Sequence, residues 1–361
     1  MYCDDSTDLL FCYDMKGCNN CLFSYGLRNK QYYIDNKPYS KEEYFEKLKA
    51  MKLDTHSGLE RARKGWNEFR AQHAIHRDAY ITNCENSSGN NLKNCKNVTD
   101  SFNVVNSEDC KYLYDVLDAK TCQDLNYSLY HPEVAYECIS TLQMRYSAFC
   151  VASHYCTSCF YCEMCNSSSD CFGCVGLNKK KYCILNKQYT KEEYEKLRTK
   201  IIEHMKKSGE WGEFFPAERA QFAYNETVAQ EYFPLKKDET EARGYTWRDK
   251  DAREYQAQTC EIPDAIADVP AMITNEILAC EDCNKNYKVI SQELRFYKNK
   301  NLPIPRKCDL CRHAARMQLR TPRQLGERTC GKCNKSITSA YQSGRPEQKI
   351  YCEGCYLAAI Y

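Results

Sequence analysis

From Cys21 the chain reads CLFSYGLRNKQYYIDNKPYSKEEYFEK, and from Cys171 it reads CFGCVGLNKKKYCILNKQYTKEEYEKL. About half of the aligned positions are identical, so the chain contains a duplicated unit at an offset of 150 residues. In each copy an alternating run ends in an Asn-Lys turn, which predicts a strand. Ser40 and Thr190 each precede a glutamate by three residues, and this capping box predicts the start of a helix. Each unit therefore resembles a strand, a turn and a helix that close a larger structure.

The region between the two units has a cysteine pattern of its own. Steps of 11–12 residues alternate with steps of 15–16, which suggests a period of about 26–28 residues, at Cys84, Cys95, Cys110, Cys122, Cys138 and Cys150. Asn, Ser and Asp recur there as turn formers, and Cys is small and apolar enough for a narrow interior. The pattern favours a parallel β-solenoid with a ladder of inward thiols; an irregular Cys-rich domain is the alternative. The first copy is preceded by only about twenty residues, so we expect either a short first unit or a longer parent chain.

The strongest chemical signal is four C-x2-C pairs near the C-terminus. They group as C-x2-C-x24-C-x2-C and C-x2-C-x18-C-x2-C, and two residues between thiols let one tight turn present both to an ion. Both first pairs precede Asn-Lys, and both second pairs begin an expected helix. Four thiolates leave no open coordination position, so we expect two structural zinc ions. The predicted ligands are Cys280, Cys283, Cys308, Cys311, Cys330, Cys333, Cys352 and Cys355.

A denser run, CTSCFYCEMC, has C-x2-C-x2-C-x2-C spacing at Cys156, Cys159, Cys162 and Cys165. It lacks the wider last gap and the following proline of the bacterial ferredoxin motif. Buried structural thiols of the solenoid are favoured, while an additional zinc or an iron–sulfur cluster stays open.

Composition excludes several classes of protein. The chain has 361 residues, of which 26 are cysteines. No apolar run approaches the length of about 18 residues that a membrane span needs. The first residues are acidic and lack the basic start of a secretory signal. Without export, disulfides are not the default use of thiols, so we expect a cytoplasmic protein that has no membrane partner.

The net charge of +2 averages two unlike regions. Residues 276–361 hold 16 Lys and Arg against eight Asp and Glu, whereas the remainder holds 35 basic and 41 acidic residues. Arginines on a zinc-finger helix beside a basic loop predict a phosphate-binding surface. The alternatives are a solvated helix face, or arginines that dock on the acidic solenoid. The candidate nucleic-acid contacts are Arg306, Lys307, Arg312, Arg316, Arg320 and Arg323.

Several motifs together resemble a known family. CFGCVGL, GEWGEFFP, YNETVAQEYFPL, LPIPRKCDLCRH and CEGCY resemble uncharacterised Cys-rich zinc-binding proteins of small-genome uncultivated bacteria, over most of the chain from Cys12 to Tyr361. The resemblance implies zinc-ribbon or treble-clef modules with a Cys-rich β-solenoid. It implies no activity and no catalytic residues.

The expected fold is mainly β with α: Cys-laddered parallel β-solenoid segments closed by strand–helix units, and a C-terminal tandem zinc-ribbon or treble-clef domain. The expected parts are 1–50, a partial solenoid end with a closing unit; 51–80, a helical linker; 81–207, the solenoid with the second closing unit; 208–275, an extended or helical linker; and 276–361, the tandem zinc-finger domain.

No clustered acids, Gly-rich phosphate loop or convincing nucleophile–base pair accompanies these features, so we expect a non-enzymatic protein. The favoured function is binding of RNA or a ribonucleoprotein through the basic zinc-finger domain. A scaffold that binds proteins on the solenoid surface is the alternative, and an iron–sulfur or redox protein is a weaker one.

Overall fold

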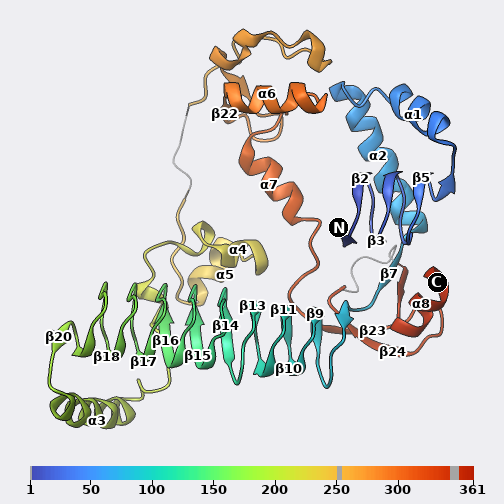
Figure 1. The fold of residues 1–361 in the computed structure, drawn as a ribbon. Coiled ribbons are helices and arrows are strands. Elements are labelled where there is room, and N and C mark those ends of the chain that lie inside the picture. Colours follow the sequence, from blue (N-terminus) through green and yellow to red (C-terminus); the bar gives the residue numbers. More distant parts are fainter. Residues whose placement is uncertain (1, 250–253, 342–348) are drawn as a thin grey trace.

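The protein is a mixed α/β structure with mostly parallel sheets (Figure 1). The computed structural model describes residues 2–249, 254–341 and 349–361. Short strands form two stacks. The first stack contains β1 (Cys3–Asp4), β2 (Thr7–Leu10), β3 (Met15–Lys16), β4 (Asn19–Leu22), β5 (Gln31–Ile34) and β6 (Lys37–Pro38). The second stack contains β8 (Ile81–Thr82), β9 (Gly89–Lys93), β10 (Lys96–Thr99), β11 (Ser101–Val105), β12 (Glu108–Lys111), β13 (Tyr114–Leu117), β14 (Gln123–Asn126), β15 (Glu133–Ile139), β16 (Arg145–Val151), β17 (Thr157–Phe160), β18 (Ser169–Phe172), β19 (Lys181–Ile184) and β20 (Lys187–Gln188).

The backbone of both stacks repeats every three residues. In the triplet Asn94-Cys95-Lys96, Asn94 has a φ of 54°, Cys95 is buried and Lys96 is exposed. We call the positive-φ residue of each triplet a corner, because the chain turns there, and the next residue the inward residue. Inward residues are small or apolar and form the continuous core of the second stack: Cys95, Val98, Ser101, Val104, Ser107, Cys110, Leu113, Val116, Ala119, Cys122 and Leu125.

Four triplets make one rung of 12 residues. Arg145 pairs in parallel with Thr157, and Thr157 pairs with Ser169, each at an offset of 12. The expected period of 26–28 residues is therefore wrong. Inward positions recur every three residues but only some hold cysteine, so the cysteine steps of 12 and 15 are multiples of three. Tyr130 and His131 both have positive φ, and this extra residue lengthens the step from Cys122 to Cys138 to 16.

Asparagine and aspartate hold most corners of the first rungs of the second stack. These residues tolerate the left-handed conformation better than other non-glycine residues. Their side chains also bond from rung to rung: Asn94 Nδ2 donates to Asn106 Oδ1 at 3.0 Å, and Asn106 Nδ2 donates to Asp118 Oδ1 at 3.0 Å. A parallel ladder joins Asn91 and Asn103 to Asp115. The corners therefore stabilise the stacking as well as the turn.

The two duplicated units close the stacks as the sequence predicts. In each unit the last parallel strand turns back as an antiparallel hairpin, β5–β6 or β19–β20. Helices α1 (Lys41–Ala50) and α3 (Lys191–Ser208) then begin with complete capping boxes at Ser40 and Thr190. Tyr44 and Tyr194 of these helices are buried against the end of their own stack. Both capping boxes and the predicted order of strand, turn and helix are confirmed in each unit.

The segments outside the stacks join distant parts of the chain. Helix α2 (His56–His73) leads to β7 (Ile75–Arg77), and the described residues after α3 form α4 (Val228–Tyr232), α5 (Lys237–Ala242), β21 (Leu278–Ala279), β22 (Asn286–Tyr287), α6 (Ser291–Lys300), α7 (Asp309–Met317), β23 (Gly326–Thr329), β24 (Ser336–Ser339), β25 (Lys349–Tyr351) and α8 (Glu353–Ile360), with short 3-10 turns at 217–219, 224–226, 266–268 and 271–275. None of the helices in the described ranges is both long and apolar enough to cross a bilayer.

The segment GEWGEFFP lies on an aromatic face of the second stack. The Trp211 ring lies 6.1 Å from Tyr161 and 6.4 Å from Phe149, and the backbone N–H of Gly212 donates to Tyr161 Oη at 3.1 Å. The first part of the expected linker 208–275 is therefore an ordered segment packed on the second stack.

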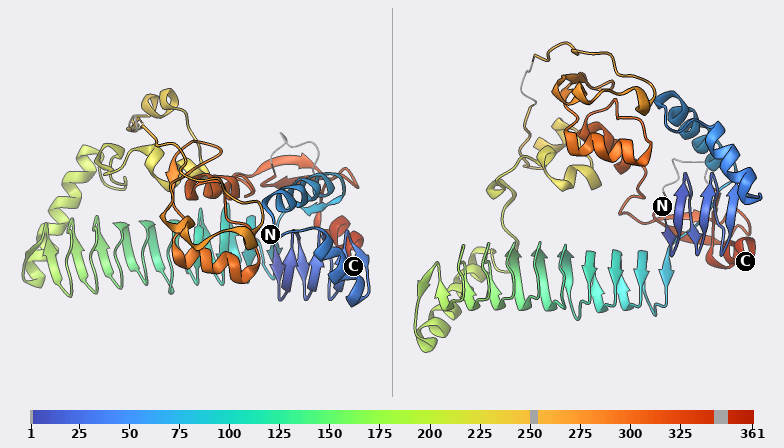
Figure 2. Two further views of the ribbon diagram at one scale, coloured as in Figure 1. Left: turned by 90° about the horizontal axis from the view of Figure 1, so that it is seen from above. Right: turned by 45° about the horizontal axis from the view of Figure 1, so that its top comes forward.

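The N-terminal rungs of the two stacks lie next to each other (Figure 2). A buried polar cluster lies between them. The rings of Tyr2 and Tyr80 stack at 3.9 Å. Tyr13 Oη lies 3.0 Å from Tyr80 Oη, 3.2 Å from Tyr341 Oη and 2.9 Å from His76 Nδ1. This hydrogen-bond network therefore joins Tyr13 of the first stack to His76 of β7, to Tyr80 in the loop after it, and to Tyr341 of the C-terminal region.

We expect the junction to weaken in mild acid. Burial, with a smaller contribution from the Arg70 charge, lowers the pKa of His76 to about 4, whereas an unfolded histidine titrates near about 6.5. The unfolded chain then binds more protons between these values, so the free energy of unfolding falls as the pH drops through that window. Between pH 7 and pH 5 the expected loss is about 2 kcal/mol.

Urea titrations at pH 7 and pH 5 measure this loss. His76→Gln should remove most of it, whereas replacement of the exposed His131 by Gln should leave it unchanged. An equal loss in the wild-type protein and in His76→Gln would contradict the assignment.

Candidate metal centres

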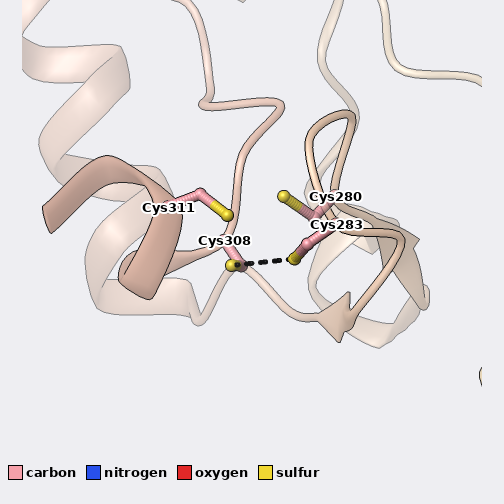
Figure 3. Close-up of side chains that lie close together, drawn as sticks. All are labelled: Cys280, Cys283, Cys308 and Cys311. Atoms are coloured by element: carbon pink, nitrogen blue, oxygen red, sulfur yellow. Dashed lines mark hydrogen bonds between the residues drawn. The ribbon is translucent and has the colours of Figure 1, made fainter. Parts of the chain in front are cut away.

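The first group of thiols joins a strand turn to a helix start. Cys280 and Cys283 lie in the turn between β21 and β22, whereas Cys308 and Cys311 lie at the start of α7. Figure 3 shows the four sulfurs facing one another across this gap. All four lie within 4.8 Å of one another.

The second group repeats the arrangement. Cys330 and Cys333 lie between β23 and β24, and Cys352 and Cys355 lie at the start of α8. Their sulfurs also lie within 4.8 Å of one another. The eight predicted ligands are thus brought together in the two predicted sets of four.

The sulfur separations fit a tetrahedral ion. Metal–sulfur bonds of about 2.3 Å place neighbouring sulfurs of a tetrahedron about 3.8 Å apart. Cys283 Sγ lies 3.8 Å from Cys308 Sγ, and Cys333 Sγ lies 3.7 Å from Cys352 Sγ. Both distances are too long for a disulfide bond and equal the edge of such a tetrahedron. The donor sets therefore fit two metal ions.

The Asn-Lys pair after each first cysteine pair has a structural reason. Asn284 and Asn334 have φ of 59° and 58°, a conformation that asparagine tolerates well. The backbone N–H of Asn284 donates to the carbonyl oxygen of Cys280 at 2.9 Å, and the backbone N–H of Asn334 donates to that of Cys330 at 3.0 Å. This turn folds the two thiols of a pair toward one point.

Backbone amides favour the thiolate form of the first cysteine in each group. Burial alone would raise the pKa of Cys280, but hydrogen bonds from the backbone of Cys308, Asp282 and Cys283 outweigh it and lower this pKa to about 6. The same balance lowers the pKa of Cys330 to about 6. Because metals bind thiolates, both groups are prepared for an ion at neutral pH.

The dense cysteine run has a different role. Cys156, Cys159, Cys162 and Cys165 are the four inward residues of consecutive triplets, so they occupy the four sides of a rung. Each sulfur also lies within reach of a backbone carbonyl, at 3.3–3.6 Å. Within the described residues, the groups able to hold a metal are the two C-terminal ones. The spacing that suggested a cluster is the triplet repeat itself.

Most of the predicted nucleic-acid contacts are engaged within the chain. Arg306 lies 3.8 Å from Glu281, Lys307 lies 2.8 Å from Asp282, and Arg312 lies 3.5 Å from Glu293. Beyond these three ion pairs, Arg320 lies over the ring of Tyr232, and Arg316 is exposed.

Arg323 is the most deeply placed of the six. It is buried between the ring of Tyr232, at 3.7 Å, and Asp115 of the second stack, to which Nη2 donates. The structure therefore places this arginine on an acid of the stack, as the docking alternative predicted.

A second anchor was missed in the sequence. Arg28 of the first stack bonds Asp14 at 3.1 Å and donates to Tyr356 Oη at 2.8 Å, and Tyr356 Oη donates to Asp14. Strand β25 also pairs in parallel with β7, through Ile350 and His76. The second thiol group therefore lies on an element fixed to the junction. No local motif marks the contacts of Tyr356 with Arg28 and of Ile350 with His76, since the partners of each lie more than 270 positions apart.

No family model matches the chain, and neither a curated protein nor a solved structure is similar to it. The chemistry of the two thiol groups and the contacts around them therefore carry the functional conclusions.

The metal content of the protein tests the assignment of the ligands. Cys283→Ser removes one of four thiolates, so the metal content of purified protein should fall from about two ions per chain to about one. Elemental analysis by mass spectrometry gives this ratio. Cys260→Ser is the matched control, since Cys260 belongs to neither group. Two ions retained in Cys283→Ser, or one ion lost in Cys260→Ser, would contradict the ligand assignment.

Proposed function

We propose that the protein is a non-enzymatic scaffold, in which two zinc-bound modules clamp a pair of β-solenoids and the solenoid surface binds other proteins. The observation that carries this proposal is the position of Arg323, buried on Asp115 of the second stack beside Tyr232. Because the guanidinium group of Arg323 is buried in this contact inside the chain, it is not accessible to a phosphate group.

Zinc is the metal that the donor sets favour. Four thiolates in a tetrahedron select soft or borderline metal ions. Zinc is such an ion, it binds four thiolates in tetrahedral structural sites, and it has no redox chemistry. A turn that presents two thiols, a hairpin, and a second pair at a helix start supports treble-clef or zinc-ribbon modules. When bound, the ion would hold the turn and the helix of each module together.

The two modules attach to different places. The first is tied to α2 through Asp264, whose carboxylate accepts hydrogen bonds from Ser57 at 2.7 and 2.8 Å, and the chain after α7 reaches the second stack at Arg323. The second is tied to the first stack through Arg28 and Tyr356. We infer that the metal modules fix the relative position of the two solenoids.

The thiols support a reducing compartment. No disulfide bond joins any two cysteines of the described residues, and most of the cysteines in the stacks are buried inward residues. Such thiols persist where glutathione and thioredoxin keep them reduced, so we place the protein in the cytoplasm.

The scaffold proposal predicts that Arg323 contributes to stability and that Arg316 contributes little. Arg323→Gln leaves Asp115 without its charged partner, so the free energy of unfolding should fall by about 1.5–3 kcal/mol. Arg316→Gln changes an exposed side chain and should alter stability by less than about 0.5 kcal/mol. Urea unfolding of both variants measures the difference.

An RNA-binding assay tests the nucleic-acid function. The scaffold proposal predicts that the wild-type protein does not retain a random RNA pool, even at low salt. Salt-dependent RNA binding that is lost when Arg312, Arg316 and Arg320 are changed to Gln would contradict it and favour the RNA-binding function.

A further inference from the structure

Some corners of the second stack hold residues that the left-handed conformation disfavours. From Tyr112 onward, Tyr, Val and Met replace the Asn and Asp of the earlier rungs at several corners. Four of them have φ of 48–60° and are 43–58% exposed: Tyr130, Val134, Tyr146 and Tyr155. Bulky and β-branched residues at positive φ are outliers that persist only when the surroundings impose the conformation. These positions thus combine backbone strain with exposed apolar surface.

Other aromatic corners of the protein have an evident role. The ring of Phe23 stacks near Trp66 of α2, and Tyr182 packs on Tyr194 of α3. Phe149 and Tyr161 are covered by Trp211. At each of these positions an aromatic corner packs on another element of the chain. Exposed bulky corners also occur singly at Tyr112, Met164 and Leu185, but Tyr130, Val134, Tyr146 and Tyr155 are gathered around one face and can act together.

The four exposed corners border a single face. Tyr130 and Tyr155 lie along one edge, and Val134 and Tyr146 lie along the other. Between them runs a column formed by Glu133, Arg145 and Thr157, which pair across neighbouring strands. We call this surface the tyrosine face. It spans three rungs and offers rings at both edges, with a Glu133–Arg145 ion pair at 3.9 Å between them.

Charge indicates the chemistry of the partner. Residues 98–178 hold ten acidic side chains against three basic ones, so this part of the stack repels a polyanion such as RNA. The same column continues through Lys120 to Glu108, beside the corners Asp109 and Asp118. A cationic partner fits both the acids and the electron-rich faces of the tyrosine rings.

The chain itself shows how such a partner binds. Arg323 lies over the rings of Tyr232 and Tyr114, at 3.7 and 5.5 Å, while it bonds Asp115. Tyr114 and Asp115 lie on the same stack, one rung before Tyr127, and the tyrosine face begins at the next corner, Tyr130. The arginine contact therefore lies at the corner column next to that of Tyr130, one face away around the stack.

We propose that the tyrosine face binds an extended, arginine-containing segment of a partner protein, with guanidinium groups stacked on the corner tyrosines. This inference rests on the scaffold function proposed above and names the surface and the chemistry of its partner. Arginine is specified over lysine because its planar cation stacks on aromatic rings.

The decisive variant replaces the corner tyrosines with asparagine, at Tyr130, Tyr146 and Tyr155. Asparagine suits the left-handed conformation, so the variant should fold with an unchanged or higher Tm while it loses the rings. Tyr161→Asn is the matched control at a covered corner. It should lower the Tm, because it removes the contacts with Trp211 and Gly212.

Binding is measured by fluorescence anisotropy with two labelled 12-residue peptides, alternating Arg-Ala and alternating Lys-Ala. The wild-type chain should bind the arginine peptide about fivefold more tightly than the lysine peptide, and the triple variant should lose this preference. Equal binding of both peptides, or a preference that survives in the triple variant, would overturn the proposal. Binding of a random RNA pool that the arginine peptide displaces would also overturn it. If the arginine variants of the scaffold test behave as expected while the peptides show no preference, this inference alone fails.

Discussion

The structure depends on one local constraint: every third residue of the stacks adopts a left-handed conformation, and the residue after it points inward. This constraint makes each rung 12 residues long and leaves room for small inward side chains such as Cys150 and Ser153. Cysteine meets that demand because it is small and apolar, and its weak S–H donor can reach a backbone carbonyl, as Cys150 does at 3.3 Å. The abundance of cysteine in the stacks is therefore a packing property, whereas the eight C-terminal thiols form two chemical sites.

A stack built this way is held together by contacts between neighbouring rungs. The two stacks touch directly through Tyr2, Tyr13 and Tyr80, and we propose that the C-terminal modules fix their relative position further. The second module pairs β25 with β7 and closes the Asp14–Arg28–Tyr356 network, and the segment after the first module buries Arg323 on the second stack. Outward corners are then free to vary, and their side chains determine what docks on the surface.

Features set by neighbouring residues could be predicted from the sequence. The capping boxes at Ser40 and Thr190 and the four C-x2-C pairs each lie within a few positions, and all are present in the structure. The period was wrong because serine, valine and leucine share the inward positions with cysteine, so cysteine spacing sampled the triplet unevenly. The docking alternative predicted the acidic stack as a partner of the arginines, but it could not identify Asp115 as the partner of Arg323, because these residues lie 208 positions apart and only the fold brings them together.

In the proposed scaffold, the metal sites clamp two stacks whose own packing needs no metal. Hydrogen exchange of the intact protein before and after chelation, followed by mass spectrometry of its peptides, tests this directly. Exchange should rise in β7, β25 and α8, while strands β15 to β18 keep their protection because their core is made of inward side chains alone. Loss of protection throughout the second stack on chelation, or no change at β7 and β25, would contradict the claim.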